Sequence, residues 1–172
     1  QTPFPNPNLE SNLESYVRFI FSRIAFVGGT DCAIIKNGKA HPKGDLKTVY
    51  LAQHAAGDVT IGVSLAERER EHIRAICLRL EGPLSIKVIG KTCRLISTMQ
   101  QDGIDGLGEI CPDGSIRIWA LFREPVPLQR AIERIMVLKT WAFIGDTVRV
   151  IPMPDELDQY IPLPPYREQH TG

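Results

Sequence analysis

The feature that most restricts the fold of this chain is an uninterrupted succession of a turn, an apolar strand, a proline-bounded break and an amphipathic helix. The turn is Pro112-Asp113-Gly114, the strand is 115–122, and the break is Arg123-Glu124-Pro125-Val126-Pro127. A helix is predicted over 127–141, because its apolar residues recur at helical spacing on one face. A further β run over 107–111 precedes the turn. An antiparallel hairpin that packs against the helix is therefore expected.

The rest of the chain alternates between helical and extended patterns. Three further helices are predicted, over 9–25, 46–55 and 85–101. Short strands are predicted over 31–35, 59–64 and 148–151, and Asn37-Gly38 predicts a tight hairpin turn. The segment 73–80 is apolar on both faces, which is typical of a central strand covered on both sides. Together these patterns predict an α+β domain with a mixed or antiparallel sheet flanked by helices.

The length of the chain favours a single domain. Its 172 residues suffice for one well-packed core and are few for two. We expect an extended arm over 1–8, one α+β domain over 9–157 and a proline-rich tail over 158–172. Charged residues crowd 67–71, where a short exposed helix or turn is expected.

The charge balance excludes a general attraction to polyanions. Lys and Arg together number 20, as do Asp and Glu, so any site for nucleic acid has to be a local patch. No stretch approaches the roughly 18 apolar residues of a membrane span, and the N-terminal residues lack the basic and apolar regions of a signal peptide. We therefore expect a cytoplasmic protein with no membrane partner, unless a leader was removed before this sequence begins.

The four cysteines have the distribution of buried structural thiols. Cys32, Cys77, Cys93 and Cys111 are widely separated and form no CxxC pair. A zinc site that combines them with His41 or His54 is disfavoured, because paired ligand spacing is absent.

Lysines concentrate around the predicted turn at Asn37-Gly38. Lys36, Lys39, Lys43 and Lys47 make this the most basic region of the sequence. A solvated hairpin rim is the favoured interpretation, and a phosphate-contacting surface is the alternative.

Several segments, in the same order and spacing, resemble the archaeo-eukaryotic primase-polymerase superfamily, especially its small primase-like domains from mobile elements and conflict systems. The resemblance runs from about Tyr50 to Leu157. It rests on Tyr50-Leu51-Ala52-Gln53-His54, Thr60-Ile61-Gly62-Val63, Ala75 to Gly82, Gly114 to Phe122, Glu124-Pro125-Val126-Pro127 and Arg149 to Leu157. It implies a primase-polymerase-like α+β fold with an RRM-like core.

The resemblance also shows where catalytic acids are missing. Members of the family place an Asp-x-Asp pair at the end of the first of these strands, and Arg79 and Glu81 occupy those positions here. The acid expected near the last strand falls on Val148, with Asp146 as an off-register substitute. Polymerase catalysis needs acids that converge on two divalent metals, and a guanidinium repels such ions. We therefore expect no metal cofactor; Mg²⁺ or Mn²⁺ would be needed only if an active site were rebuilt from displaced acids.

Arg117 stands where the family has a histidine that contacts nucleotide phosphates. Arginine grips phosphate in a bidentate fork, so Arg79, Arg117 and Arg149 would form an anion site in place of a metal site. The alternative is that these arginines pair with Glu81 and Glu109 on a solvent face. Trp119, two residues after Arg117, is expected in the core rather than as a base-stacking platform.

Three functions follow from these features. The first is a catalytically degenerate primase-polymerase-like domain that binds nucleic acid or a nucleotide, or that scaffolds a replication or mobile-element complex. Its expected partners are DNA or RNA, single-stranded or primer-template, and a protein of a larger replication or defence complex. The second is an active nucleotidyltransferase with displaced acids, Glu81, Glu109 and Asp146. The third is a protein-interaction module that docks through its proline-rich tail and binds no nucleic acid.

Overall fold

The computed structural model describes residues 7–26, 30–45, 48–67, 71–143 and 145–166. Within these residues, four helices and eight strands follow one another as α1 (Pro7–Ile24), β1 (Cys32–Lys36), β2 (Lys39–Gly44), α2 (Thr48–Ala56), β3 (Thr60–Ser64), β4 (His72–Leu80), α3 (Ile86–Gln101), β5 (Asp105–Ile110), β6 (Ile116–Pro127), α4 (Leu128–Ala142), β7 (Val148–Ile151) and β8 (Tyr160–Pro162). The fold is α+β, as the sequence predicts.

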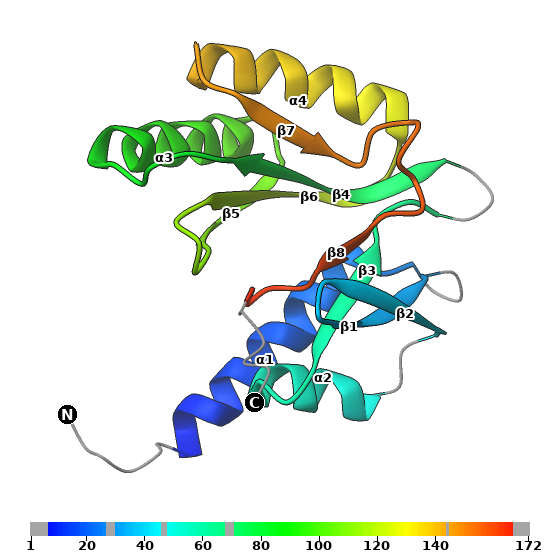
Figure 1. Cartoon of the computed structure of the whole chain (residues 1–172). Coiled ribbons are helices and arrows are strands. Elements are labelled where there is room, and N and C mark those ends of the chain that lie inside the picture. The colour runs from blue at the N-terminus through cyan, green and yellow to red at the C-terminus, as the bar shows by residue number, and fades with distance from the viewer. Residues whose placement is uncertain (1–6, 27–29, 46–47, 68–70, 144, 167–172) are drawn as a thin grey trace.

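The strands form two four-stranded antiparallel sheets, where the sequence predicts one sheet (Figure 1). The first has the order β2-β1-β3-β8, and the second has the order β5-β6-β4-β7. The predicted hairpin turn joins β1 to β2, and Asn37 and Gly38 have φ angles of 51° and 72°. Both residues are thus in the left-handed region that a tight primed turn requires.

In the second sheet β4 is central, as its two apolar faces predict. It pairs with β6 on one side and with β7 on the other. Strand β6 differs from expectation because it continues through the predicted break to Pro127. A register shift opposite Ile73 and Ala75 lets Val126 and Pro127 rejoin the ladder, opposite Ile73 and His72. A bulge of this kind bends a strand without ending it.

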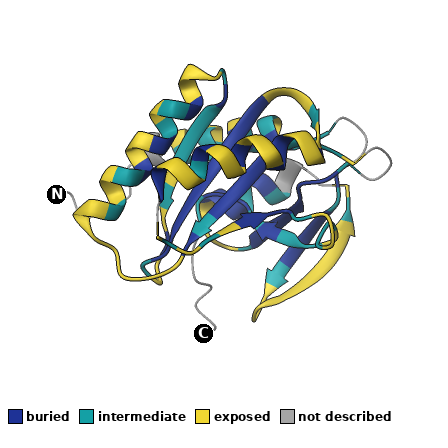
Figure 2. Ribbon diagram, turned by 90° about the horizontal axis from the view of Figure 1, so that it is seen from above, coloured by how far each residue is buried: buried dark blue, intermediate teal, exposed yellow. Residues whose placement is uncertain are grey.

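The two faces of the second sheet pack against different layers. One face carries Leu78 and Ile118, which lie in a core with residues of α3 and α4. The other face carries Cys77 and Trp119, which pack with residues of α1, α2 and the first sheet. Figure 2 shows these strands buried beneath helices whose outward sides are exposed. Polar residues on the face that carries Cys77 and Trp119 therefore lie on the side of the first sheet.

Part of the expected tail belongs to the folded structure. Tyr160–Pro162 form β8, which pairs with β3, and Leu163 is completely buried. A strand of three residues that itself ends in a proline, Pro162, is too short to show the alternation that predicts a strand. Residues 167–172 of the expected tail, most of the arm over 1–8, Lys47 and much of the charged run over 67–71 lie outside the described residues. None of the described helices is long and apolar enough to cross a membrane.

Candidate functional site

Strand pairing in the second sheet aligns one glutamate and three arginines. Glu109 on β5 lies opposite Arg117 on β6, Arg117 opposite Arg79 on β4, and Arg79 opposite Arg149 on β7. Residues directly opposite one another share a face of a sheet. Here it is the face that carries Trp119 and Cys77, on the side of the first sheet. The structure therefore brings together the three arginines, which we call the arginine row.

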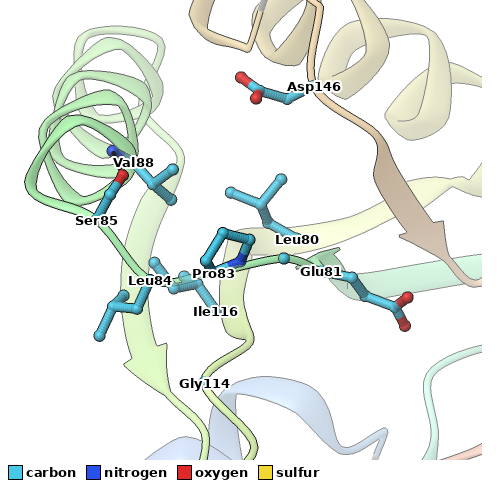
Figure 3. A pocket seen from close by; sticks show the side chains of 10 residues that line it. Leu80, Glu81, Pro83, Leu84, Ser85, Val88, Gly114, Ile116 and Asp146 are labelled. Atoms are coloured by element: carbon cyan, nitrogen blue, oxygen red, sulfur yellow. Dashed lines mark hydrogen bonds between the residues drawn. The ribbon is translucent and has the colours of Figure 1, made fainter.

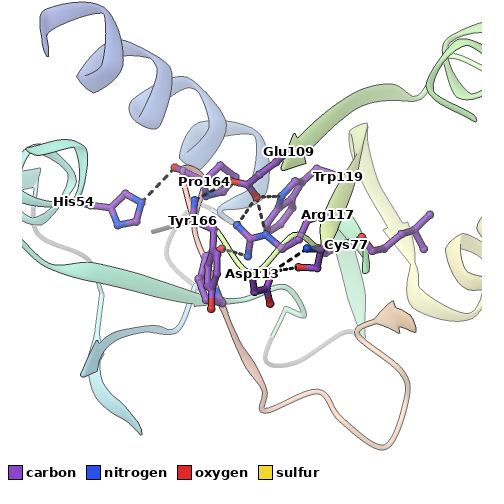
Figure 4. A network of polar contacts seen from close by, with 11 residues as sticks. His54, Cys77, Glu109, Asp113, Arg117, Trp119, Pro164 and Tyr166 are labelled. Carbon is purple, nitrogen blue, oxygen red and sulfur yellow. Dashed lines mark hydrogen bonds and ion pairs between the residues drawn. The ribbon is translucent and has the colours of Figure 1, made fainter. Parts of the chain in front are cut away.

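Arg117 is the buried end of the row, and Figure 4 shows it among Glu109, Trp119 and Tyr166. Its side chain is 4% exposed, and its Nε and Nη2 atoms lie 2.6 and 2.5 Å from Glu109 Oε1. Its Nη1 donates to the Pro162 carbonyl at 2.7 Å. The guanidinium also lies 5.2 Å from the Trp119 ring centre and 4.9 Å from that of Tyr166. Protein groups thus occupy both the edge and the faces of this guanidinium.

Glu109 joins this network to the C-terminal segment. Its Oε2 accepts a hydrogen bond from the backbone N–H of Tyr166 at 2.7 Å, and its Oε1 lies 3.4 Å from Trp119 Nε1. Glu109 is 11% exposed at its side chain. It therefore acts as the counter-charge of Arg117 and as an anchor for the chain that follows β8.

Arg79, the middle member, is partly accessible. Its Nη2 lies 2.9 Å from Asp113 Oδ2, its Nε lies 3.6 Å from Glu81, and its side chain is 31% exposed. The other Asp113 oxygen accepts from the hydroxyl and the backbone N–H of Ser115, at 2.6 and 2.9 Å. These bonds and the nearby Arg79 lower the pKa of Asp113, with the Ser115 hydroxyl as the largest cause. Asp113 therefore stays charged beside Arg79.

Arg149 is the exposed end of the row. Its Nη2 lies 3.0 Å from Glu156 and 3.3 Å from Gln159, and its side chain is 50% exposed. Exposure thus rises from Arg117 through Arg79 to Arg149. Only the last two can contact a molecule in solution without a rearrangement of the protein.

The acids proposed for a displaced active site do not converge. Val148 lies opposite Leu80 and packs with the core under α3 and α4, on the other face from Arg79. Asp146 forms an ion pair with Lys91 of α3 at 2.6 Å. Figure 3 shows the carboxylates of Glu81 and Asp146 pointing apart at a pocket of about 210 Å³ that both residues line.

The third of these acids, Glu109, is held by Arg117. Within the described parts of the chain, no group of three or more His, Cys, Asp or Glu side chains could hold a metal ion. The combination of Glu81, Glu109 and Asp146 is therefore not assembled in this structure.

The sequence does not reveal several residues of the site. It predicts Asp113 in a turn, and one Asp113 oxygen does serve the turn while the other binds Arg79. Glu156, Pro162 and Tyr166 lie in segments without periodicity, so no sequence signal marked them as partners of the row.

The cysteines have the environment of structural thiols, with one exception. Cys32, Cys77 and Cys111 are buried, whereas Cys93 is exposed on α3. Burial raises the pKa of Cys77 to about 12 and that of Cys32 to about 11. His54 is also buried, and its Nδ1 accepts from the Ile61 N–H at 3.0 Å.

No protein-family model matches the chain, and no curated protein matches its sequence. Among solved structures, it is similar to the polymerase domain from Mycobacterium tuberculosis Ligase D in complex with DNA. The TM-score is 0.44 and the sequence identity is 11%. The similarity covers 78% of this chain and 62% of the other, so the chain spans less than two thirds of that structure.

Proposed function

We propose that the protein is a primase-polymerase-like domain that binds nucleic acid through Arg79 and Arg149 and does not carry out metal-dependent nucleotidyl transfer. The observation that carries this proposal is the arginine row, aligned by strand pairing on the face toward the first sheet. The sequence resemblance supplies the class of domain, and the row supplies the chemistry.

The two outer arginines suit phosphate because their present partners are replaceable. Exposed ion pairs contribute about 0–1 kcal/mol, so Asp113 and Glu156 hold Arg79 and Arg149 weakly. A phosphate oxygen can take the place of either carboxylate and accept from the same guanidinium in a bidentate geometry.

Arg117 has a different part in this proposal. Because Glu109 and Pro162 already accept its hydrogen bonds, Arg117 fixes the end of β8 beside the row. The phosphate contact first expected of Arg117 is therefore proposed for Arg79 and Arg149 alone.

The same arrangement argues against two-metal chemistry. Arg79 and Glu81 stand where the resemblance places two acids, and Val148 stands where it places a third. Glu81 is 75% exposed at its side chain and lies within ion-pair distance of Arg79. A guanidinium so near would raise the energy of any dication bound there.

Binding of a fluorescent oligothymidylate, followed by anisotropy over a series of salt concentrations, tests the proposal. The double variant Arg79→Ala/Arg149→Ala should bind more weakly, with a salt slope smaller by about 1.4, because each lost phosphate contact removes about 0.7 from the slope on single strands. A matched control is Lys87→Ala/Arg94→Ala, which removes two exposed charges from α3, on the opposite side of the sheet. Equal effects of the two double variants would refute the site.

The alternative of an active enzyme has its own test. Primer extension with Mn²⁺ and deoxynucleotides should give no product, with or without Glu81→Ala. Product that Glu81→Ala abolishes would instead establish a metal site with displaced acids.

A second candidate function, protein interaction, is favoured by one observation on the outer helices. Ile86 on α3 is 90% exposed, and Trp141 and Val137 on α4 are 78% and 50% exposed. Val137 and Trp141 are four residues apart and so are neighbours on one helix face. Exposed apolar side chains that are close together are typical of protein contacts. The proline-rich segment, by contrast, is partly built into the first sheet.

A further inference from the structure

The hairpin of β1 and β2 belongs to the first sheet (Figure 1), and its sequence contains a second group of basic residues. Lys36 lies opposite Lys39, and Ile34 lies opposite His41, so these four side chains share one face of the hairpin. Cys32 pairs with Gly44 while Ala33 pairs with Pro42, which leaves Lys43 as the extra residue of a bulge. Bulges re-aim side chains, and this one supplies a further lysine beside His41.

These side chains surround a concave site. A cavity of about 300 Å³ has an apolar and aromatic part and a basic part, and its lining residues are Ile34, Lys36, His41, Lys43, Tyr50 and Val59. Tyr50 comes from α2, so the cavity lies between the hairpin and a helix. We call it the hairpin pocket. Lys39 shares the hairpin face but does not line the pocket.

The charges of the hairpin pocket are not neutralised by the described part of the protein. Lys36, His41 and Lys43 are exposed and have no hydrogen bond or ion pair with any described residue. The arginine row differs in this respect, because each of its members has a carboxylate partner. Like charges near one pocket repel each other, and a bound anion removes that repulsion.

We propose that the hairpin pocket binds a phosphate group, supplied either by a free nucleotide or by a nucleic-acid chain. Lys36 and Lys43 provide the charge, His41 provides a ring N–H donor, and Tyr50 provides an aromatic wall for the group attached to the phosphate. The site is separate from the arginine row and does not depend on the function proposed above. The hairpin pocket would bind phosphate even if Arg79 and Arg149 bind no ligand.

The test uses three probes on the full chain: pyrophosphate and ATP by calorimetry without added metal, and an oligothymidylate by anisotropy. Lys36→Ala/Lys43→Ala should weaken binding of the responding probe by about tenfold or more, as expected when two charge-assisted contacts are lost. Lys39→Ala is the matched control, since it removes one charge from the same face but outside the pocket, and should change binding less than about twofold. Arg79→Ala/Arg149→Ala should leave the part of pyrophosphate and ATP binding that depends on Lys36 and Lys43 in place, because the hairpin pocket is separate from the arginine row. Thermal unfolding of each variant confirms that it folds.

The responding probe identifies the source of the phosphate. Pyrophosphate or ATP binding that depends on Lys36 and Lys43 supports a nucleotide ligand, and oligonucleotide binding alone with that dependence supports a nucleic-acid chain. Absence of binding of all three probes to the wild type overturns the proposal. It is also overturned if Lys39→Ala weakens binding as much as the double variant, because the charge is then diffuse. If pyrophosphate or ATP binding is lost in Arg79→Ala/Arg149→Ala and kept in Lys36→Ala/Lys43→Ala, the phosphate binds at the arginine row and the proposal for the hairpin pocket is overturned. If the arginine variants change no binding, the function proposed for the row is wrong, and the proposal for the hairpin pocket still stands.

Discussion

Substitution of Glu109 by alanine should destabilise the fold far more than loss of an ordinary surface charge. Glu109 faces Arg117, whose side chain is only 4% exposed, and the pair is held by contacts of 2.5 and 2.6 Å. Removing one partner of a buried pair leaves an uncompensated charge, which costs about 3–5 kcal/mol. The backbone N–H of Tyr166 loses its acceptor as well. For a chain of this size each kcal/mol lowers the melting temperature by about 2–4 °C.

The loss can be measured by urea unfolding followed by circular dichroism. The matched control is Glu156→Ala, which breaks the pair with Arg149, whose side chains are 50% and 39% exposed. That control should cost less than about 1 kcal/mol. The variant Glu109→Leu/Arg117→Met replaces the whole pair by apolar groups and should recover much of the stability that either single change removes.

The coupling energy between Glu109 and Arg117 should then exceed about 2 kcal/mol. A cost below about 1 kcal/mol for Glu109→Ala, equal to that of Glu156→Ala, would refute this reasoning. Arg117 would in that case be weakly held and available to a ligand, as the sequence first suggested.

The remaining predictions concern two glycines, Gly90 on α3 and Gly106 on β5, and the cysteines. Gly90→Ala should stabilise the protein by about 0.5–1 kcal/mol in urea unfolding, because no atom lies within 4 Å of the added Cβ and alanine favours a helix. Gly106→Ala should destabilise it by about 1–3 kcal/mol, since its Cβ would lie 2.8 Å from Met99 Cε and 2.9 Å from Ile96 Cγ2; no loss of stability would show that both side chains move aside freely. A thiol reagent at mildly alkaline pH should modify Cys93 alone in the native protein, and a second rapidly labelled thiol would contradict the burial described above. Burial raises the pKa of Cys77 in the folded protein to about 12, above the ordinary 9.0 of a cysteine, so the stability that the protonated thiol contributes is full below pH 9 and is lost as the pH rises toward 12. Cys77→Ala should flatten that alkaline loss of stability in unfolding titrations.

The sequence predicted the helices and most strands because their patterns repeat over many residues. The helix predicted over 85–101 is α3, Ile86–Gln101, and the strand from Ile73 to Leu80 is the centre of its sheet. The separation into two sheets could not be predicted, since hydrophobic alternation shows that a strand is buried and not which strand it pairs with. Strand β8 could not be predicted either, because its three residues, Tyr160–Pro162, are too few to show a period and include a proline.

The arginine row was predictable in part. The alignment of the row follows from the hairpin of β5 and β6, with β4 and β7 placed beside it. For Arg117 the sequence left two alternatives, phosphate binding and pairing with glutamate, and the structure shows the pair with Glu109. The burial of Arg117 was not predictable. It depends on Tyr166 and Pro162, which reach the row only because β8 pairs with β3 far away in the sequence.

The difference in neutralisation between the two basic surfaces predicts how a nucleic-acid chain that contacts both would bind. Each arginine of the row has its own carboxylate, so the row projects little charge into solution and acts at contact distance. The lysines of the hairpin pocket have no described partner, so their field reaches about a Debye length, roughly 10 Å in ordinary buffer. Unpaired rim charges mainly govern association rates, whereas contacts formed at close range govern dissociation. In stopped-flow measurements Lys36→Ala/Lys43→Ala should therefore slow association, and Arg79→Ala/Arg149→Ala should speed dissociation. The reverse assignment would mean that the carboxylates do not screen the row.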